Sequence, residues 1–315
     1  MGQSVGGAGN ISMDFPALVS GMYDVRPIER ARWNVLDLLN WISRKAVTAQ
    51  MFCEIDTSQA EALLSTLSEN GEKITITALL LKAISIAQLD CPESRSYRLP
   101  WGLKVVRSQP VAGFTVERLV DGRPAVFFAS IANAHTKSLE EIAREISAYG
   151  RNDIDSVTQL AKEHLLSKVP WLLRQFYIAI GLNVPALRHV INPATFGLTS
   201  LGKFGMGAPC APNVTTTIFG IGSMEPKVVA RDNKVEVRNM MEVALSADLR
   251  ILGFYKAAYL LQDIKTLVES GLAAHLTDDE RDIVARAQAK LAVPVLSSSE
   301  ERFAKNGRRR ATDAA

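Results

Sequence analysis

Two features are scarce in this sequence: cysteine and long hydrophobic runs. The three cysteines, Cys53, Cys91 and Cys210, are widely separated and odd in number, which argues against a disulfide framework and suits a reducing compartment. No uninterrupted apolar run reaches about 18 residues, so no segment is expected to span a membrane. The first residues lack a charged stretch followed by an apolar one, so we expect no secretory signal. These absences predict a soluble, cytoplasmic protein.

The sequence also has little excess of positive over negative charge. The net charge of +3 is too small to indicate a nucleic-acid-binding protein, and no basic patch alternates with aromatic residues. The short basic run Arg308–Arg310 is expected to be a solvated chain end rather than a binding site. We also predict no metal site.

Apolar residues, in contrast, are abundant and occur in both helical and strand patterns. The hydrophobic content of 47% allows a sizeable core. The expected elements are helices over 27–45, from about 57 to 70, over 78–89 and over 278–291, a strand over 51–56, and hairpins pairing 111–119 with 125–131 and 227–230 with 234–237. Capping boxes, in which a hydroxyl residue precedes glutamate by three positions, are predicted at Ser138 with Glu141 and at Thr277 with Glu280. Strands and helices mix without a regular βαβ repeat, which indicates an α+β domain around a mixed sheet.

Three parts are expected along the chain. Residues 1–21 are predicted to be a flexible leader, 22–275 the core, and 276–315 a C-terminal helix followed by a disordered basic tail. Within the core, the amphipathic and aromatic-rich segment 153–187 looks like an insert. Such a segment can lie in a membrane interface, cover a lipophilic substrate channel or, as the commoner outcome, be buried against its own or a neighbouring subunit.

Several segments, in order, resemble one family of enzymes. Phe196–Gly202, Ile218–Gly222 and Met240–Ser246 resemble three strands in the catalytic cores of the dihydrolipoamide acyltransferases of 2-oxo acid dehydrogenase complexes, which are relatives of chloramphenicol acetyltransferase. The run Ser246–Gly253, which follows a hairpin pattern and precedes an amphipathic helix, resembles their Asp-His-Arg-x-x-Asp-Gly signature. The resemblance covers about residues 24–272.

This resemblance implies a fold, an assembly and a substrate class. The fold would be a chloramphenicol acetyltransferase-like α+β mixed-sheet sandwich. Members of the family form homotrimers with active sites in channels between subunits, where one subunit supplies the signature histidine and its neighbour supplies a hydroxyl on a strand. The substrate would be a thioester of coenzyme A or of a carrier, with no tightly bound cofactor. No lipoyl or peripheral-subunit-binding domain is recognisable, so the chain resembles a standalone member of the family.

The signature has lost its histidine and its second aspartate. Leu249 takes the place of the histidine that is the general base of the family, and Leu252 the place of the second aspartate. Losing a positioned general base typically costs about 10²–10⁴ in rate. Asp248 and Arg250 are retained, and the resemblance implies that they pair to hold the loop beside the active site. Gly253 is expected to provide the turn into the next helix.

Other candidate residues surround the strand over 196–202. Thr199 stands where the family carries the Ser or Thr that donates to the developing oxyanion; the alternative is an ordinary strand threonine paired across the sheet. Ser200 and Cys210 are expected to line the substrate channel. His189 is a candidate for a relocated base and Cys210 for a nucleophile, although a structural role is the commoner outcome for both.

Three functions remain open at this point. The first is an acyltransferase acting on a thioester, with Thr199 as oxyanion donor and with substrate-assisted or relocated proton transfer. The second is a non-catalytic trimeric scaffold or partner-binding subunit. The third is an enzyme of altered, base-independent chemistry that binds an apolar ligand in the channel between subunits. Thr199 and the retained pair of Asp248 and Arg250 favour the first.

Overall fold

The computed structural model describes residues 46–68, 73–99, 102–120, 123–151, 169–231 and 233–292, together with Asp37 and Leu166. The expected leader, the first helix as a continuous element, the turn at 121–122, most of the first half of the insert-like segment and the tail beyond 292 lie outside these residues. The elements from 46 onward can be compared with the sequence patterns.

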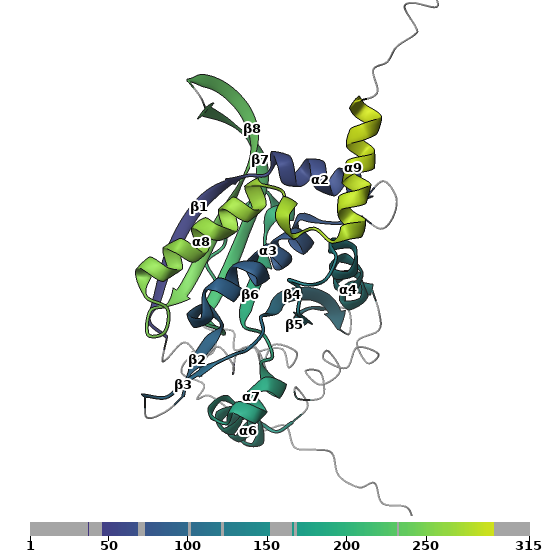
Figure 1. Cartoon of the computed structure of the whole chain (residues 1–315). Helices are drawn as coiled ribbons and strands as arrows, with labels where there is room; N and C mark the ends of the chain where they lie inside the picture. Colours follow the sequence, from purple (N-terminus) through teal and green to yellow (C-terminus); the bar gives the residue numbers. More distant parts are fainter. Residues whose placement is uncertain are drawn as a thin grey trace, which may run out of the picture.

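A six-stranded sheet forms the centre of the molecule (Figure 1), with the strand order β1-β8-β7-β6-β4-β5. Strand β6 pairs in parallel with both β4 and β7, and the other neighbours are antiparallel. The strands are β1 (Thr48–Asp56), β4 (Val111–Val120), β5 (Arg123–Ala132), β6 (Phe196–Ser200), β7 (Thr217–Arg231) and β8 (Lys234–Asp248), and a separate two-stranded ribbon pairs β2 (Ser96–Arg98) with β3 (Lys104–Val106). The expected α+β fold around a mixed sheet is confirmed.

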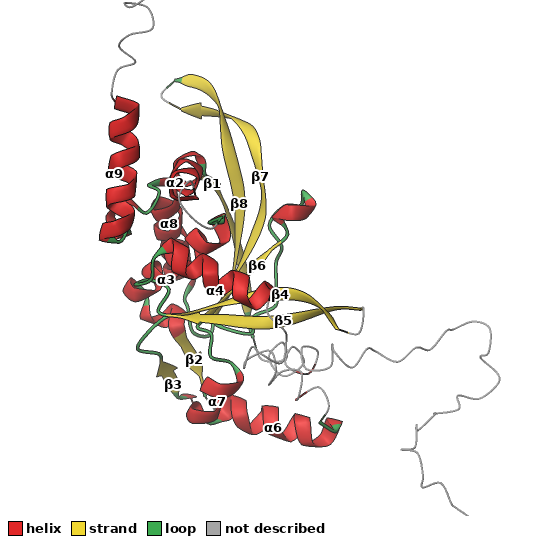
Figure 2. Cartoon of the chain, turned by 90° about the vertical axis from the view of Figure 1, so that its right-hand side faces the viewer, coloured by secondary structure: helices red, strands yellow, loops and turns green. Residues whose placement is uncertain are grey.

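Helices lie on one side of this sheet (Figure 2). Those beside the sheet are α2 (Ser58–Ser68), α3 (Ile76–Asp90), α4 (Leu139–Arg151) and α8 (Phe254–Glu269); the remaining ones are α6 (Trp171–Asn183), α7 (Pro185–Ile191), α9 (Asp278–Ala292) and the short 3₁₀ turns η3 (Pro92–Arg95), η6 (Gly202–Phe204) and η7 (Ala273–His275). Helices α6 and α7 lie beyond the end of the sheet, next to the β2–β3 ribbon (Figures 1 and 2). None of the helices among the described residues is long and apolar enough to cross a membrane.

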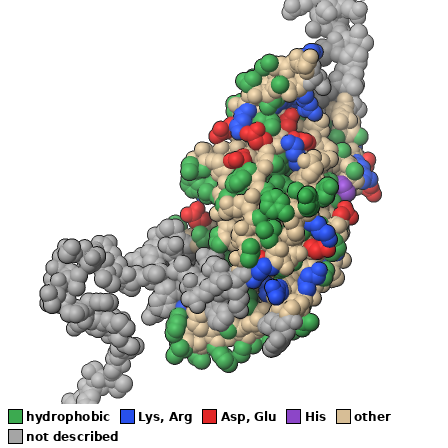
Figure 3. All heavy atoms as spheres, turned by 90° about the vertical axis from the view of Figure 1, so that its left-hand side faces the viewer, with side chains coloured by type: hydrophobic (Ala, Val, Ile, Leu, Met, Phe, Trp, Pro, Cys, Tyr) green, Lys and Arg blue, Asp and Glu red, His purple; other side chains and the backbone are tan. Residues whose placement is uncertain are grey.

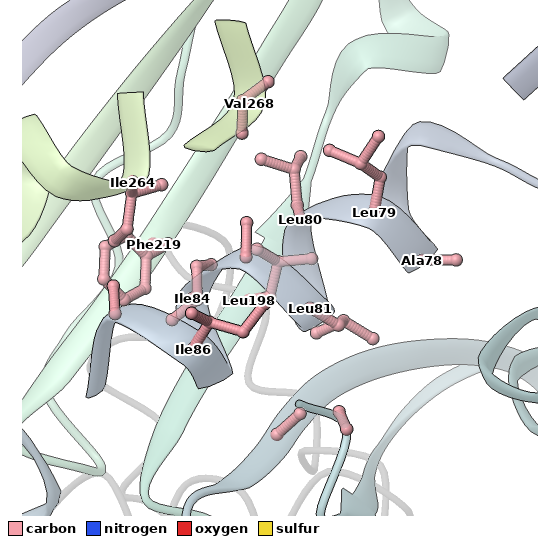
Figure 4. Packing of buried hydrophobic residues seen from close by; sticks show 14 of the residues in the cluster. Ala78, Leu79, Leu80, Leu81, Ile84, Ile86, Leu198, Phe219, Ile264 and Val268 are labelled. Atoms are coloured by element: carbon pink, nitrogen blue, oxygen red, sulfur yellow. The ribbon is translucent and has the colours of Figure 1, made fainter. Parts of the chain in front are cut away.

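The core is built around α3, which is apolar on nearly every side. Leu79, Leu81 and Ile84 of this helix are wholly inaccessible to solvent, as expected for a helix without a polar face. These three side chains pack between the sheet and α8 (Figure 4). The sheet contributes Leu198 and Phe219 to this cluster, and α8 contributes Ile264 and Val268. This packing fixes the start of β6 and β7 against α3, and with it the edge of the sheet where the signature turn lies.

The second hairpin is much longer than the sequence pattern suggested. The expected strands over 227–230 and 234–237 are only the outer ends of β7 and β8, whose pairing runs from Thr217 opposite Ala247 to Arg231 opposite Lys234. The register shifts between Ile221 and Met224, so one half of the hairpin lies in the sheet and the other projects beyond it (Figure 2). The outer half carries exposed valines on its surface, which is why its alternation resembled an isolated hairpin.

Both predicted capping boxes are present, but they differ in burial. The backbone N–H of Glu141 donates to Ser138 Oγ at 3.1 Å and that of Ser138 to the Glu141 carboxylate at 2.9 Å, both exposed to solvent. The equivalent carboxylate of Glu280 accepts from Thr277 N–H at 2.8 Å and also from Leu139 N–H at 2.6 Å. Glu280 is 5% exposed, so the second box ties the C-terminal helix to the start of α4.

Candidate functional site

The turn that follows β8 contains the predicted pair of charges. Asp248 is 5% exposed, and its carboxylate accepts from Arg250 Nε at 2.9 Å, Arg250 Nη2 at 2.5 Å and Arg250 N–H at 3.1 Å. These hydrogen bonds to Asp248 raise the pKa of Arg250. The turn is also held by its backbone, because Asp248 N–H donates to the Thr216 carbonyl oxygen at 2.9 Å and Leu249 N–H to that of Val47 at 2.8 Å. Leu249 is therefore fixed in place and half-buried, although its side chain has no proton to exchange.

The residues that follow Leu249 differ from what the sequence pattern predicted. Leu252 is wholly buried in the hydrophobic core, so it does not replace a polar group beside Leu249. Counted from Asp248, the second aspartate of the signature falls at Gly253 and not at Leu252. Gly253 begins α8 at φ −62° and ψ 154°, and a Cβ built there meets nothing within 4 Å. Because any residue adopts that conformation, the turn does not need a glycine; what position 253 lacks is the carboxylate.

Thr199, the candidate donor to the oxyanion, lies on β6, which is separated from β8 by β7. Thr199 Oγ1 on β6 is half-buried and accepts from Thr115 Oγ1 of β4 at 3.4 Å. That contact leaves the Thr199 proton available to a further acceptor. Ser200 is exposed, and its Oγ accepts weakly from Gly202 N–H at 3.4 Å.

One chain does not bring Thr199 and Leu249 together. The register places Thr199 beside Gly220 of β7, which lies beside Ala244 of β8. From Ala244 the chain continues along β8 and its turn for five residues before it reaches Leu249, a separation of about 17 Å at strand spacing. Two strand widths add about 10 Å across the sheet. Within a single chain the two halves of the candidate site therefore lie at opposite ends of β6.

A loop over 205–213 crosses β7 and carries Cys210. A Cβ built on Gly220 would lie 1.8 Å from the Pro209 carbonyl oxygen, and one on Gly222 would lie 2.9 Å from the Ala208 nitrogen. The Ala208 N–H donates to the Glu242 carboxylate at 3.0 Å. Two glycines of β7 thus permit the loop to lie directly on the strand, where Cys210 is exposed.

The histidines are not placed at the signature turn by any contact among the described residues. His189 is exposed on α7, where partial burial and the nearby charge of Arg107 lower its pKa. His135 is half-buried, and its Nδ1 has no hydrogen-bond partner among the described residues. Burial and the charge of Lys82 lower the pKa of His135.

The described part of the insert-like segment exposes a large apolar surface. On α6, Trp171, Leu172 and Phe176 are 57%, 71% and 68% exposed. The one charged side chain of this helix, Arg174, is 1% exposed and its Nε donates to the Asp37 carboxylate at 2.5 Å. Helix α6 therefore buries Ile178 and Leu182 against its own chain, whereas Trp171, Leu172 and Phe176 stay exposed.

A polar pocket was not anticipated from the sequence. It is lined by Tyr97 of β2, Arg107 just after β3, and Arg188 and Asn192 at the end of α7, together with the residues that lead into β6 and β7. These residues are far apart in sequence and meet only through the β2–β3 ribbon and α7, so no local pattern announced them. No group of three or more possible metal ligands occurs among the described residues.

A family model and curated relatives match this chain. Residues 187–276 match the model described as 2-oxoacid dehydrogenases acyltransferase (catalytic domain). A chloroplastic dihydrolipoyllysine-residue acetyltransferase component 5 of the pyruvate dehydrogenase complex from Arabidopsis thaliana is 26% identical over 221 residues, which are 68% of this chain and 40% of the relative. A lipoamide acyltransferase component of the branched-chain alpha-keto acid dehydrogenase complex from Pseudomonas putida is 27% identical over 223 residues, 69% of this chain and 45% of that protein. The chain thus spans less than half the length of these two relatives.

Solved structures show the same fold. A dihydrolipoamide acetyltransferase from Azotobacter vinelandii is similar with a TM-score of 0.61 at 19% identity, covering 87% of this chain and 100% of that one. A probable dihydrolipoamide acetyltransferase from Listeria monocytogenes gives 0.57 at 23% identity, with 78% and 94% covered. The Azotobacter enzyme was investigated for the roles of a serine, a histidine and an asparagine in its catalytic mechanism, the last two separated by four positions. The same spacing from Leu249 leads to Gly253.

Proposed function

We propose that this chain, a member of the 2-oxoacid dehydrogenase acyltransferase family, transfers an acyl group from a coenzyme A or carrier thioester in a site shared by two protomers of a homotrimer. The observation that carries the proposal is the separation of Thr199 from Leu249 on a sheet whose signature turn keeps its Asp248–Arg250 frame. A hydroxyl at one end and an ordered turn at the other can act on one substrate only if they come from different chains.

Thr199 stabilises the oxyanion that forms during the reaction. When a nucleophile attacks the thioester carbonyl carbon, negative charge develops on the carbonyl oxygen. The Thr199 hydroxyl, which already accepts from Thr115, donates its proton in a hydrogen bond to that oxygen. The carbon–sulfur bond then breaks, and the departing thiolate takes up the proton that the acceptor has released.

Leu249 determines how that proton is removed. A leucine cannot accept it, so the acceptor must ionise in solution or lose its proton to a group on the substrate. The expected cost relative to a positioned base is about 10²–10⁴ in rate. The missing carboxylate at Gly253 is a second difference at the same turn, so the reaction is slow or uses an acceptor that is already ionised.

A second candidate function is a non-catalytic trimeric subunit. It is favoured by the same two positions, Leu249 and Gly253, because a scaffold needs neither a base nor its partner. Base-independent chemistry on an apolar ligand agrees with Leu249 equally well, and the exposed apolar residues of α6 provide a surface for such a ligand or for a neighbouring subunit.

Thioester turnover in a matched set of variants tests the proposal. Thr199→Val keeps the shape of the side chain and removes the hydroxyl, and we expect about 10²–10³ lower turnover. Leu249→His combined with Gly253→Asp restores the histidine and the second aspartate of the signature, and we expect about 10²–10⁴ higher turnover. Light scattering on each variant checks that the mass is three times 34.4 kDa.

Two outcomes would contradict the proposed enzymatic function or the role of Thr199 in it. If wild-type turnover does not exceed the background and the restored signature does not raise it, the scaffold is favoured. If Thr199→Val has full activity, Thr199 is an ordinary strand residue and the oxyanion is held elsewhere.

A further inference from the structure

Side chains from three elements meet where β6 and β7 begin. Tyr97 stands opposite Val105 in the β2–β3 ribbon, and Arg107 N–H continues the ladder by donating to the Arg95 carbonyl oxygen at 3.2 Å. Because side chains alternate along a strand, Tyr97 and Arg107 project from the same face of the ribbon. Arg188 of α7 closes the pocket, with its Cζ 4.0 Å from the centre of the Tyr97 ring.

The positive charges of this pocket are not balanced by carboxylates. Among the described residues, neither Arg107 nor Arg188 pairs with an Asp or Glu, and the Arg188 guanidinium donates one hydrogen bond, to the Leu182 carbonyl oxygen at 3.2 Å. Burial and the charge of Arg107 lower the pKa of Arg188 to about 10, and burial lowers that of Arg107. On the face seen in Figure 3, Lys and Arg side chains gather towards the end of the molecule where the ribbon lies, with few Asp or Glu side chains among them.

A third arginine at the pocket is already occupied. Arg95 Nε donates to the Arg107 carbonyl oxygen at 2.7 Å, and its Nη1 donates to the carbonyl oxygens of Gln88 and Leu89 at the end of α3. It thus satisfies backbone carbonyls that a helix end leaves unpaired. Arg95 positions Arg107 and the ribbon, and leaves Arg107 and Arg188 as the charges that face the pocket.

The Tyr97 hydroxyl is an independent sign of a ligand. Tyr97 is 7% exposed, and its buried oxygen has no hydrogen-bond partner in the part of the chain that the structure describes. A buried hydroxyl without a partner is costly, so a native structure seldom retains one without a reason. An anionic oxygen in the pocket would accept from this hydroxyl and from both guanidinium groups.

We propose that Tyr97, Arg107 and Arg188 form a subsite for a phosphate group of the thioester carrier. The pocket volume of about 10 Å³ admits roughly one oxygen atom, so the rest of the phosphate lies at its mouth. The pocket also adjoins the signature turn, because Thr216 lines it and accepts from Asp248 N–H. The proposal rests on the proposed function for the identity of the anion, while the anion site itself follows from the unbalanced charges.

Binding of inorganic phosphate tests the subsite without any turnover. Titration calorimetry at constant ionic strength is expected to show binding to wild type that weakens about tenfold in Tyr97→Phe, since a hydrogen bond to a charged group is lost. Arg107→Gln is expected to weaken it at least as much. Arg98→Gln is the matched control, because Arg98 is exposed on β2, the strand that carries Tyr97, and this variant should bind phosphate like wild type.

Kinetics then identify the source of the phosphate. With an acyl-coenzyme A, Tyr97→Phe and Arg107→Gln are expected to raise KM about tenfold with little change in kcat. With the matching acyl-pantetheine, which has no phosphate, their KM should equal that of wild type.

The outcomes separate the two proposals. Phosphate binding that is lost in the variants, without thioester turnover in wild type, leaves the subsite standing and removes the proposed function. Equal phosphate binding in wild type, Tyr97→Phe and Arg107→Gln, or none in wild type, overturns the subsite. A change of oligomeric mass in Arg107→Gln would also overturn it, by showing that Arg107 takes part in a contact between copies of the chain.

Discussion

The turn at Leu249 and the pocket at Arg188 both hold partly buried arginine, and they differ in what surrounds it. At the turn, Arg250 has a carboxylate on the same loop, and every polar atom of Asp248 is used in a hydrogen bond. In the pocket, two guanidinium groups and a buried hydroxyl converge without any carboxylate among the described residues. A charge that is satisfied within the chain maintains structure, whereas one that is left unsatisfied indicates a ligand.

The largest effect is expected from removing the carboxylate of the turn, which tests whether the pair of Asp248 and Arg250 maintains structure. Asp248→Asn leaves Arg250 without its counter-charge and disturbs the hydrogen bonds of a residue that is 5% exposed. We expect a loss of about 3 kcal/mol in the free energy of unfolding, measured by urea denaturation. A loss below about 0.5 kcal/mol would show that the pair contributes little to stability, as surface pairs do.

The second capping box offers a matched pair of substitutions. Glu280→Gln removes the charge that lies 3.9 Å from Lys82 Nζ, and both side chains are buried, with 6% and 1% exposure. We expect a cost of about 2 kcal/mol, because breaking a buried pair leaves the other charge uncompensated. Glu141→Gln in the exposed box is the control and should cost about 0.5 kcal/mol. Equal losses in the two variants would contradict a special role for Glu280.

Removing a charge from the pocket should change the free energy of unfolding in the opposite direction. In phosphate-free buffer, Arg107→Gln removes one of two neighbouring positive charges, and we expect the free energy of unfolding to rise by less than about 1 kcal/mol. The same measurement on Arg98→Gln provides the baseline for loss of an arginine on this ribbon. Destabilisation by Arg107→Gln would mean that Arg107 already has a partner in the folded chain.

The smallest effect concerns pH. His135 has a pKa below the usual 6.5 because of burial and the charge of Lys82, and His189 shifts in the same direction. Below pH 6.5 the unfolded chain therefore binds protons that the folded chain does not, so stability falls as the pH drops towards the lowered pKa values and is regained as the pH rises to 6.5. His135→Gln should flatten this slope in urea titrations at several pH values. An unchanged slope in His135→Gln would assign the effect to other groups.

Local patterns predicted the fold well where they had a local cause. The capping boxes, the apolar helix around Leu81 and the first hairpin depend on residues close in sequence, and all are present. The long β7–β8 pairing was missed because a register shift after Ile221 divides the strands into two parts with different burial. The sequence pattern then resembled four short strands instead of two long ones.

The candidate site was predictable only in part. The pairing of Asp248 with Arg250 involves residues two positions apart and followed from the signature. Leu252 was misassigned, because the spacing of the signature from Asp248 leads to Gly253, and the burial of Leu252 in the core agrees with that count. The pocket at Arg188 could not be predicted, because it depends on how α7 lies against Tyr97, and no spacing within the sequence encodes that contact.

The three cysteines differ enough in burial that one of them, Cys210, can be labelled selectively. Burial raises the pKa of Cys53 to about 11 and raises that of Cys91 as well, so both thiols stay protonated and unreactive near neutral pH. Cys210 is exposed on a loop that the glycines of β7 hold against the sheet. A maleimide dye or spin label should therefore attach to Cys210 in the unmodified chain, and distances between labels would test the proposed homotrimer.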